Sequence, residues 1–324
     1  MFKQKPKIFI TRKLPKNIET RMMELFDTTL NESDVLLTEN QLIQVFKDYQ
    51  IIVPSIADKI TKKVIDSASE NTSLIANFGA GTDHIDLVSA KKKKIIVTNT
   101  PGLLAEDTAD LIMALLLALP RRLYEGSKLL AKGNWNGWSP TNMLGKRIYG
   151  MRLGIIGMGR IGQAVAKRAK GFGVSIHYHN RKRLPGNIEE SHEATYWNSL
   201  DEMIERMDII SINCPLTKET KGLMSKRRLE LMMTDSFIIN SSRSEIIDEK
   251  ALLELLNSNK IAGAGLDVFR RREKGNSELL NAANTILIPH MGSATIEGRI
   301  EMGEKVIVNI KTFIDGHNPP NRII

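Results

Sequence analysis

The chain has 324 residues, a length that predicts two domains or one large one. Hydrophobic residues make up 42% and charged residues 26%, which excludes a disordered chain, a collagen-like fibre and a low-complexity tail. The formal net charge of +9 is compatible with nucleic acid, anionic lipid or small anions as partners. The single cysteine, Cys214, excludes an internal disulfide and a zinc site of the CxxC kind, and it agrees with a cytoplasmic location.

No segment predicts a membrane anchor or a targeting signal. The apolar run Ile8–Ile10 near the N-terminus is far too short for a signal-peptide core. The longest apolar run, Leu111–Leu119, falls short of the ~18–20 residues needed to cross a bilayer and is expected to be a buried helix. We therefore expect no membrane partner.

Short apolar runs alternate with helical patterns in the first hundred residues. Strands are expected at 7–11, at 51–55 and at the end of 91–100, and 74–81 is expected to be a strand that enters a glycine turn. Helices are expected at about 17–27 and 60–69. The four lysines at 91–94 are expected to end a helix, where cations interact favourably with its dipole, rather than to bind nucleic acid. This alternation predicts a parallel sheet with helices on both faces.

A second strand–helix series follows an apolar helix at 105–119 and a polar, Gly- and Trp-rich loop at 132–145. A long amphipathic helix, from about 295 to 314, could return to the first series. The fold class is therefore α/β, with two domains that each contain a parallel sheet. The expected strands of the second series are 152–157, 175–179, 208–214, 236–240, 262–268 and 285–290.

A GxGxxG motif lies between the first strand and the first helix of the second series, in the run Gly157-Met158-Gly159-Arg160-Ile161-Gly162. In this context the first glycine permits a tight turn, the second lets a pyrophosphate approach the backbone, and the third allows close packing of helix and strand. The pyrophosphate would sit on the helix N-terminus. The motif predicts a dinucleotide-binding domain.

The end of the next strand predicts which dinucleotide is bound. Proteins that bind NAD usually place Asp or Glu about 20 residues after the first glycine, on the ribose 2′-OH. Asn180 occupies that place here, and Arg181 and Lys182 follow it. A carboxylate would repel a 2′-phosphate, whereas an arginine can bind it with two hydrogen bonds. We expect NADP(H) to be preferred, with NAD(H) possible; the alternative is a solvated basic loop.

Three later segments place polar residues directly after apolar strands, at 239–243, 265–269 and 289–293. In open α/β sheets ligands bind at the carboxyl ends of the strands. These segments are therefore candidates for the substrate and catalytic residues.

Together the motifs resemble the D-isomer-specific 2-hydroxyacid dehydrogenase family, over essentially the whole chain. The resemblance is carried by FGAGTDHID (78–86), GMGRIG (157–162), CPLT (214–217), INSSR (239–243), GLDVF (265–269) and PHMGSAT (289–295). Within the family, HYHNRKRL (177–184) and WNGWSP (135–140) are most similar to bacterial glyoxylate/hydroxypyruvate reductases.

The resemblance implies two Rossmann-like domains and a homodimer. A flavodoxin-like substrate domain would comprise 1–103 and 295–324, and the dinucleotide-binding domain would comprise 104–294. Dimers would form through the dinucleotide-binding domain, and the 105–145 arm would reach the partner.

Reduction of a 2-keto acid needs a hydride on C2, a proton on the carbonyl oxygen and a clamp for the carboxylate. His290 suits the proton transfer because the pKa of histidine lies near working pH, and Arg243 suits the carboxylate and the ketone. By resemblance, Ala80 and Gly81 would bind substrate and Asp267 would lie near the nicotinamide. The resemblance also places Cys214, Pro215, Ser241, Ser242 and Gly292 along the cofactor, and it implies no metal.

One position departs from the family pattern. The family places a catalytic glutamate five residues after the Asp of GLDVF, but Arg272 stands there and Glu273 comes one later. Either the loop shifts to bring Glu273 to His290, or the carboxylate partner is missing.

The sequence therefore predicts an NADP(H)-dependent reductase of glyoxylate, hydroxypyruvate or a similar 2-keto acid to the D-2-hydroxy acid. One alternative is another D-2-hydroxyacid oxidoreductase, of the D-lactate or D-phosphoglycerate type. A second alternative, from another class, is a dinucleotide-sensing corepressor-like protein. Arg243 and His290 together argue against a sensor, which needs neither of them.

Overall fold

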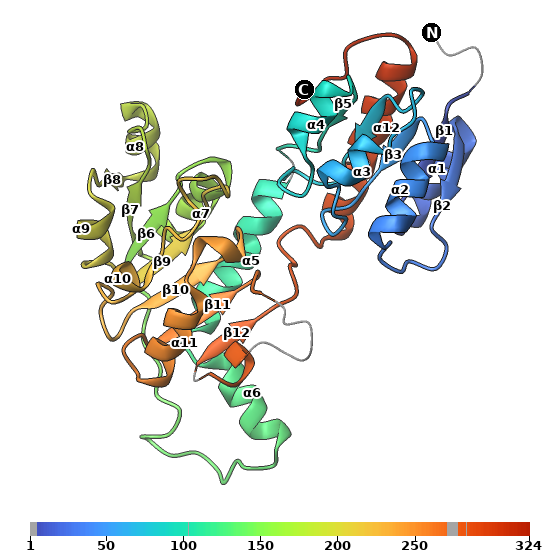
Figure 1. Cartoon of the computed structure of the whole chain (residues 1–324). Helices are drawn as coiled ribbons and strands as arrows, with labels where there is room; N and C mark the ends of the chain where they lie inside the picture. Colours follow the sequence, from blue (N-terminus) through green and yellow to red (C-terminus); the bar gives the residue numbers. More distant parts are fainter. Residues whose placement is uncertain (1–4, 103, 271–277, 283) are drawn as a thin grey trace. The chain divides into compact units, whose positions relative to one another are not determined.

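The computed structural model describes residues 5–102, 104–270, 278–282 and 284–324 (Figure 1). The chain divides into two compact units: Met1–Leu104 with Ala294–Ile324 form the first, and Ala105–Ser293 form the second. Each unit contains one sheet in which every strand pair is parallel. The predicted α/β fold with two parallel sheets is confirmed.

The first unit has a five-stranded sheet of order β2-β1-β3-β4-β5. Its strands are β1 (Lys7–Ile10), β2 (Asp27–Leu30), β3 (Ile51–Val53), β4 (Leu74–Ala76) and β5 (Ile96–Thr98). Its helices are α1 (Lys16–Leu25), α2 (Glu39–Asp48), α3 (Lys62–Asp66), α4 (Leu87–Lys92) and α12 (Ile296–Ile314). Separate apolar clusters cover the two faces, since Ile8 and Ile10 of β1 join one cluster and Phe9 packs against the other. Burial on both faces is what a parallel sheet requires.

The late helix α12 belongs to this first unit. Met302, Val306, Ile307 and Ile310 of α12 lie in the same apolar cluster as Ile8. The residues after α12 continue this return, because Ile323 donates its backbone N–H to the carbonyl oxygen of Val97 in β5 at 2.8 Å. The chain therefore leaves the first unit and comes back to complete it.

The second unit has a seven-stranded sheet of order β12-β11-β10-β9-β6-β7-β8. Its strands are β6 (Arg152–Ile156), β7 (Ser175–His179), β8 (Ala194–Tyr196), β9 (Ile209–Ile212), β10 (Phe237–Asn240), β11 (Gly263–Leu266) and β12 (Thr285–Leu287). Its helices are α5 (Leu104–Ala118), α6 (Leu123–Ala131), α7 (Arg160–Lys170), α8 (Gly186–His192), α9 (Leu200–Ile204), α10 (Lys226–Leu229) and α11 (Glu249–Asn257), with 3₁₀ turns at Ser244–Ile246 and Glu278–Asn281. The strand order reverses between β6 and β9, which is where a ligand binds in such sheets.

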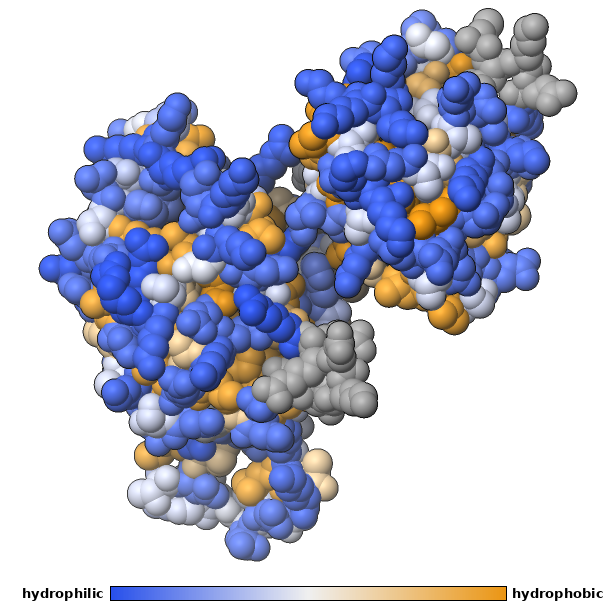
Figure 2. Space-filling model, viewed as in Figure 1, coloured by the Kyte–Doolittle hydropathy of each residue, from blue (hydrophilic) through white to orange (hydrophobic). Residues whose placement is uncertain are grey.

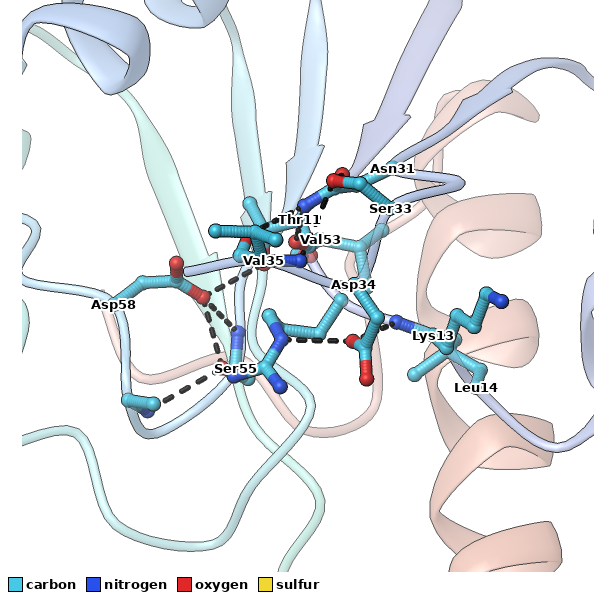
Figure 3. A network of polar contacts seen from close by, with 12 residues as sticks. Thr11, Lys13, Leu14, Asn31, Ser33, Asp34, Val35, Val53, Ser55 and Asp58 are labelled. Carbon is cyan, nitrogen blue, oxygen red and sulfur yellow. Dashed lines mark hydrogen bonds and ion pairs between the residues drawn. The ribbon is translucent and has the colours of Figure 1, made fainter. Parts of the chain in front are cut away.

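A buried carboxylate ties the carboxyl ends of β1 and β3 together in the first unit (Figure 3). Asp58 has no exposed surface, and its Oδ2 accepts hydrogen bonds from Thr11 Oγ1 at 2.7 Å and from the nitrogen and Oγ of Ser55 at 2.8 Å each. Thr11 follows β1 and Ser55 follows β3, so the carboxylate closes the point at which this sheet reverses its strand order. Its other oxygen, Oδ1, is buried and has no hydrogen-bond partner among the described residues, so this network satisfies one of the two oxygens of Asp58.

Candidate active site

The glycine turn has the geometry that a pyrophosphate needs. Gly157 has a φ of +96°, and a Cβ there would lie 2.7 Å from the backbone nitrogen of Cys214. A Cβ on Gly162 would lie 2.5 Å from the carbonyl oxygen of Gly157, so only glycine lets α7 pack this closely. A Cβ on Gly159 would meet nothing within 4 Å, which leaves open space in front of the helix N-terminus. Arg160 and Ile161 form the first turn of α7.

Asn180 closes the next strand and is tied to the glycine turn. Its Oδ1 accepts a hydrogen bond from the backbone nitrogen of Met158 at 2.7 Å. The side chains of Arg181 and Lys182 are exposed beyond it, and neither makes a hydrogen bond or ion pair among the described residues. Two exposed cations thus flank the place at which the ribose 2′ group of a dinucleotide is bound in this fold.

A second turn joins the ends of β9 and β10. The hydroxyl of Ser242 donates to the carbonyl oxygen of Cys214, while the buried Asn240 accepts from the nitrogen of Ser242 at 3.0 Å and donates to the carbonyl oxygen of Arg243 at 2.9 Å. Pro215 follows Cys214 and is exposed. These bonds fix the backbone from 240 to 243 beside the glycine turn.

Cys214 is suited to lining a site rather than to nucleophilic attack. Its side chain is buried, and burial raises the pKa of its thiol to about 11. The attacking species of cysteine is the thiolate, which such a pKa suppresses at neutral pH.

Asp267 holds the turn that carries His290. Its two carboxylate oxygens accept hydrogen bonds from the backbone nitrogens of Met291 at 2.5 Å and Gly292 at 2.9 Å, and its carbonyl oxygen accepts from the nitrogen of His290 at 2.9 Å. His290 has a φ of +55°, a left-handed backbone that costs a non-glycine residue about 1–3 kcal/mol. The surrounding hydrogen bonds maintain that conformation and leave His290 exposed.

Opposing effects act on the pKa of the Asp267 carboxyl group. Burial raises the pKa of its carboxyl group, while the backbone hydrogen bonds from Met291 and Gly292 and the nearby His290 lower it, and the net direction is upward. The effect of His290 on this pKa places its imidazole near the Asp267 carboxylate, and histidine is a residue suited to proton transfer.

In the first unit, Gly79-Ala80-Gly81 forms a turn after β4. Asn77 donates to the carbonyl oxygens of Gly79 and Gly81, at 2.9 Å each, and Asn99 donates to that of Ala80 at 2.7 Å. The three carbonyl groups of this turn therefore point toward the buried side-chain amides of Asn77 and Asn99. The N–H groups of Ala80 and Gly81 donate to no acceptor among the described residues, and such N–H groups can receive a carboxylate.

The second unit therefore brings most of the predicted residues to one sheet edge. The turns of Arg243, Asp267 and His290 follow β10, β11 and β12, which are neighbours in the sheet, and the glycine turn follows β6 on the same edge. Ser241 lies in the Arg243 turn. Ala80 and Gly81 lie in the other unit. Glu273, like Arg272, lies outside the described residues.

Sequence reasoning missed the residues that shape these turns. Asn240 orders the Arg243 turn and Asn77 with Asn99 orders the Gly79–Gly81 turn. The available signal was an asparagine at or just after an apolar strand, where a short amide can bond the following backbone.

Among the described residues there is no group of three or more His, Cys, Asp or Glu side chains that could hold a metal ion. In the same part of the chain no helix is both long and apolar enough to cross a membrane.

Comparison with known proteins gives a consistent result. Residues 113–292 match the NAD binding domain of the D-isomer specific 2-hydroxyacid dehydrogenases. The chain is 40% identical to a glyoxylate reductase from Thermococcus litoralis over 323 residues, which cover 98% of this chain and 97% of that protein.

Two solved structures illustrate the structural likeness. An NADPH-dependent glyoxylate/hydroxypyruvate reductase from Sinorhizobium meliloti, in complex with NADP and malonate, is 32% identical with a TM-score of 0.86, covering 99% of this chain and 97% of that one. A glyoxylate reductase from Paecilomyces thermophila is 28% identical with a TM-score of 0.85, covering 98% of each chain.

These matches confirm the predicted family and two Rossmann-like domains, and the NAD binding domain means that the cofactor is a nicotinamide dinucleotide. The chain therefore belongs to the D-isomer specific 2-hydroxyacid dehydrogenase family and is an NAD(P)-dependent 2-hydroxyacid oxidoreductase.

Proposed function

We propose that this oxidoreductase reduces small 2-keto acids, foremost glyoxylate and hydroxypyruvate, to D-2-hydroxy acids with NADPH as the preferred cofactor. The observation that carries the proposal is the shared sheet edge, where the Arg243, Asp267 and His290 turns lie on three neighbouring strands. The glycine turn and its open helix N-terminus on that edge fit a dinucleotide. The names of the relatives support the substrate class.

The residues named above divide the tasks of this reaction. A reduced nicotinamide dinucleotide, when bound, would supply the hydride that C2 of the keto acid takes up. Arg243 pairs with the carboxylate and polarises the ketone, and the N–H groups of Ala80 and Gly81 hold the carboxylate. His290 donates the proton that the carbonyl oxygen takes up. Asp267 keeps the His290 turn in place.

The cofactor preference rests on Asn180, Arg181 and Lys182. No carboxylate stands at the end of β7, and the two cations beyond it are exposed and make no hydrogen bond or ion pair among the described residues. Cys214, Pro215, Ser241, Ser242 and Gly292 are proposed to line the cofactor.

The deciding experiment is a panel of 2-keto acids assayed with NADPH and with NADH, in parallel with Arg243→Gln and His290→Gln. We expect turnover of glyoxylate and hydroxypyruvate, a higher kcat/KM with NADPH, and a loss of about 100-fold or more in each variant. Cofactor binding without turnover of any keto acid would instead favour a dinucleotide sensor.

The proposed carboxylate partner of His290 is Glu273. A carboxylate near histidine favours the imidazolium form and extends reductase activity to higher pH. Glu273→Gln should lower kcat/KM and move the alkaline fall in activity to lower pH. If Arg272 occupies the place instead, Arg272→Glu should raise activity and Glu273→Gln should do little.

We also propose a homodimer formed through the second unit. The segment from α6 to β6 exposes several large apolar or aromatic side chains. At the foot of the view in Figure 2, orange side chains lie among hydrophilic ones. Large apolar side chains that gather on the surface of a folded protein mark interaction sites. In sedimentation experiments the wild type should be a dimer, and the Leu130→Glu, Trp138→Glu double variant should be a monomer. The exposed side chains are Leu123, Tyr124, Leu130, Trp135, Trp138, Leu144 and Tyr149.

A further inference from the structure

A buried hydroxyl group lies under the loop that follows β7. Tyr178 has no exposed surface, yet its oxygen makes two hydrogen bonds. It accepts from the backbone nitrogen of Leu184 at 2.9 Å, and it donates to the carboxylate of Glu189 on α8. Burial and the hydrogen bond to Glu189 raise the pKa of Tyr178 to about 12, so the hydroxyl keeps its proton at neutral pH.

Glu189 in turn binds Arg183 with both oxygens. Arg183 Nε lies 2.9 Å from Oε1 and its Nη2 lies 2.7 Å from Oε2. The Glu189 side chain is 11% exposed and that of Arg183 is 65% exposed, so the carboxylate is sheltered and its two hydrogen bonds orient a guanidinium that stays at the surface. Arg183 also lies over the ring of Tyr196, at 5.8 Å from its centre. The third cation of the basic loop is therefore already neutralised.

The other end of the loop is fixed as well. Asn180 bonds the nitrogen of Met158 through its side chain, and its carbonyl oxygen accepts from the hydroxyl of Tyr196 at 3.4 Å. Between the two fixed ends, only Arg181 and Lys182 have no hydrogen bond or ion pair among the described residues. The loop thus offers two cations from a backbone that is held at both ends.

We propose that Tyr178 is a positioning residue for cofactor selection, because its hydroxyl holds this loop so that Arg181 and Lys182, and not Arg183, bind the 2′-phosphate of NADP. The inference rests on the proposed preference for NADP(H). A loop that is ordered before binding loses less conformational entropy when the phosphate arrives, and its benefit applies only to the cofactor that carries the phosphate.

The test compares Tyr178→Phe with Arg181→Ala, Arg183→Ala and a matched control, Tyr49→Phe directly after α2, whose hydroxyl makes no hydrogen bond among the described residues. Tyr178→Phe keeps the ring and the net charge. We expect its KM for NADPH to rise about 3–10-fold, with kcat unchanged and the KM for NADH within about twofold. Arg181→Ala should show a larger selective loss, Arg183→Ala at most about a threefold one, and Tyr49→Phe none.

Binding of two fragments gives a readout that does not depend on turnover. Calorimetry with adenosine 2′,5′-bisphosphate and with adenosine 5′-monophosphate should show that Tyr178→Phe weakens only the bisphosphate. An equal loss for both fragments would mean a general structural role and would overturn the proposal. The proposal would also be overturned if Arg181→Ala selectively weakened binding of the bisphosphate while Tyr178→Phe did not. That result would leave the proposed function intact. If Arg181→Ala is itself not selective, the NADP preference fails and this inference fails with it.

Discussion

The side-chain oxygen of Asn180 accepts a hydrogen bond from the backbone nitrogen of Met158 at 2.7 Å, which joins the end of β7 to the middle of the glycine turn. Asn180 therefore does more than leave room for a phosphate: it also supplies an acceptor that orders the turn. An aspartate could supply the same acceptor, but it would bring a negative charge to the place of the 2′ group.

This relationship leads to a prediction on cofactor choice. Asn180→Asp keeps the hydrogen bond to Met158 and should reverse the preference, because the carboxylate repels a 2′-phosphate and accepts from a 2′-hydroxyl. The ratio of kcat/KM for NADPH to that for NADH should fall about 10–100-fold. Steady-state kinetics with both cofactors checks this, and Asn180→Ala is the control, since it should weaken both cofactors alike. An unchanged ratio in Asn180→Asp would contradict the assignment.

A second prediction concerns the His290 turn. Asp267→Asn replaces one accepting oxygen by an amide that cannot accept from a backbone N–H, so the bond to Met291 or Gly292 is lost. We expect kcat to fall about 10–100-fold with little change in the binding of the dinucleotide. Stopped-flow and equilibrium titration separate the two effects, and the exposed Asp235→Asn serves as the matched control. Equal kcat values for the wild type and Asp267→Asn would exclude this positioning role.

The buried thiol gives a third prediction. Because burial raises the pKa of Cys214 to about 11, the folded protein should hardly react with iodoacetamide at pH 8, whereas the unfolded chain should react readily. Mass spectrometry of the alkylated peptide provides the measurement. Cys214→Ala should retain at least about half of the activity; a loss of 100-fold would instead point to a chemical role.

The amino-terminal edge of the second sheet provides a prediction on stability and pH. Burial alone would raise the pKa of Asp208, but hydrogen bonds from the side chain and backbone of Arg152 outweigh it and leave the pKa below its ordinary value. A depressed pKa stabilises the fold above the unfolded pKa of about 3.9, and this contribution is lost as pH falls through the folded pKa.

Asp208→Asn should therefore lower the free energy of unfolding by about 1–2 kcal/mol at pH 7, a value reduced because the pair is partly exposed. The difference from the wild type should shrink toward pH 3. Urea unfolding at both pH values provides the measurement, with kcat as a control that should not change. A difference that stays constant with pH would rule out the linkage.

The strands that the sequence predicts are those with apolar runs. The central strands β1, β6, β9 and β10 lie at the predicted places because their residues are buried on both faces. The edge strands β2 and β8 were missed, since Asp27–Leu30 and Ala194–Tyr196 contain no fully buried residue and carry no apolar run. The helices α2 and α6 were also not identified. The segment 74–81 is, as expected, a strand that enters a glycine turn, with the strand ending at Ala76.

The candidate site also has features that the sequence predicts and features that it does not. The motifs predicted which residues stand at the sheet edge, because the carboxyl ends of parallel strands must share one edge. They could not predict that Asp267 bonds two backbone nitrogens of the next turn, or that Tyr178 reaches Leu184. Such bonds depend on turn conformations, among them the positive φ of His290, that no local pattern encodes.

The return of α12 to the first unit has a consequence for synthesis on the ribosome. The second unit is one continuous segment, Ala105–Ser293, so all of it can emerge and fold while the first unit still lacks α12 and the residues that pair with β5. The part that begins translation should thus be the last to acquire its native packing. The test is limited proteolysis of stalled nascent chains that end near residue 300 and carry an added linker long enough to fill the exit tunnel. The second unit should be protected and the first should be cut. Equal protection would show that α1 and β1 are stable without α12.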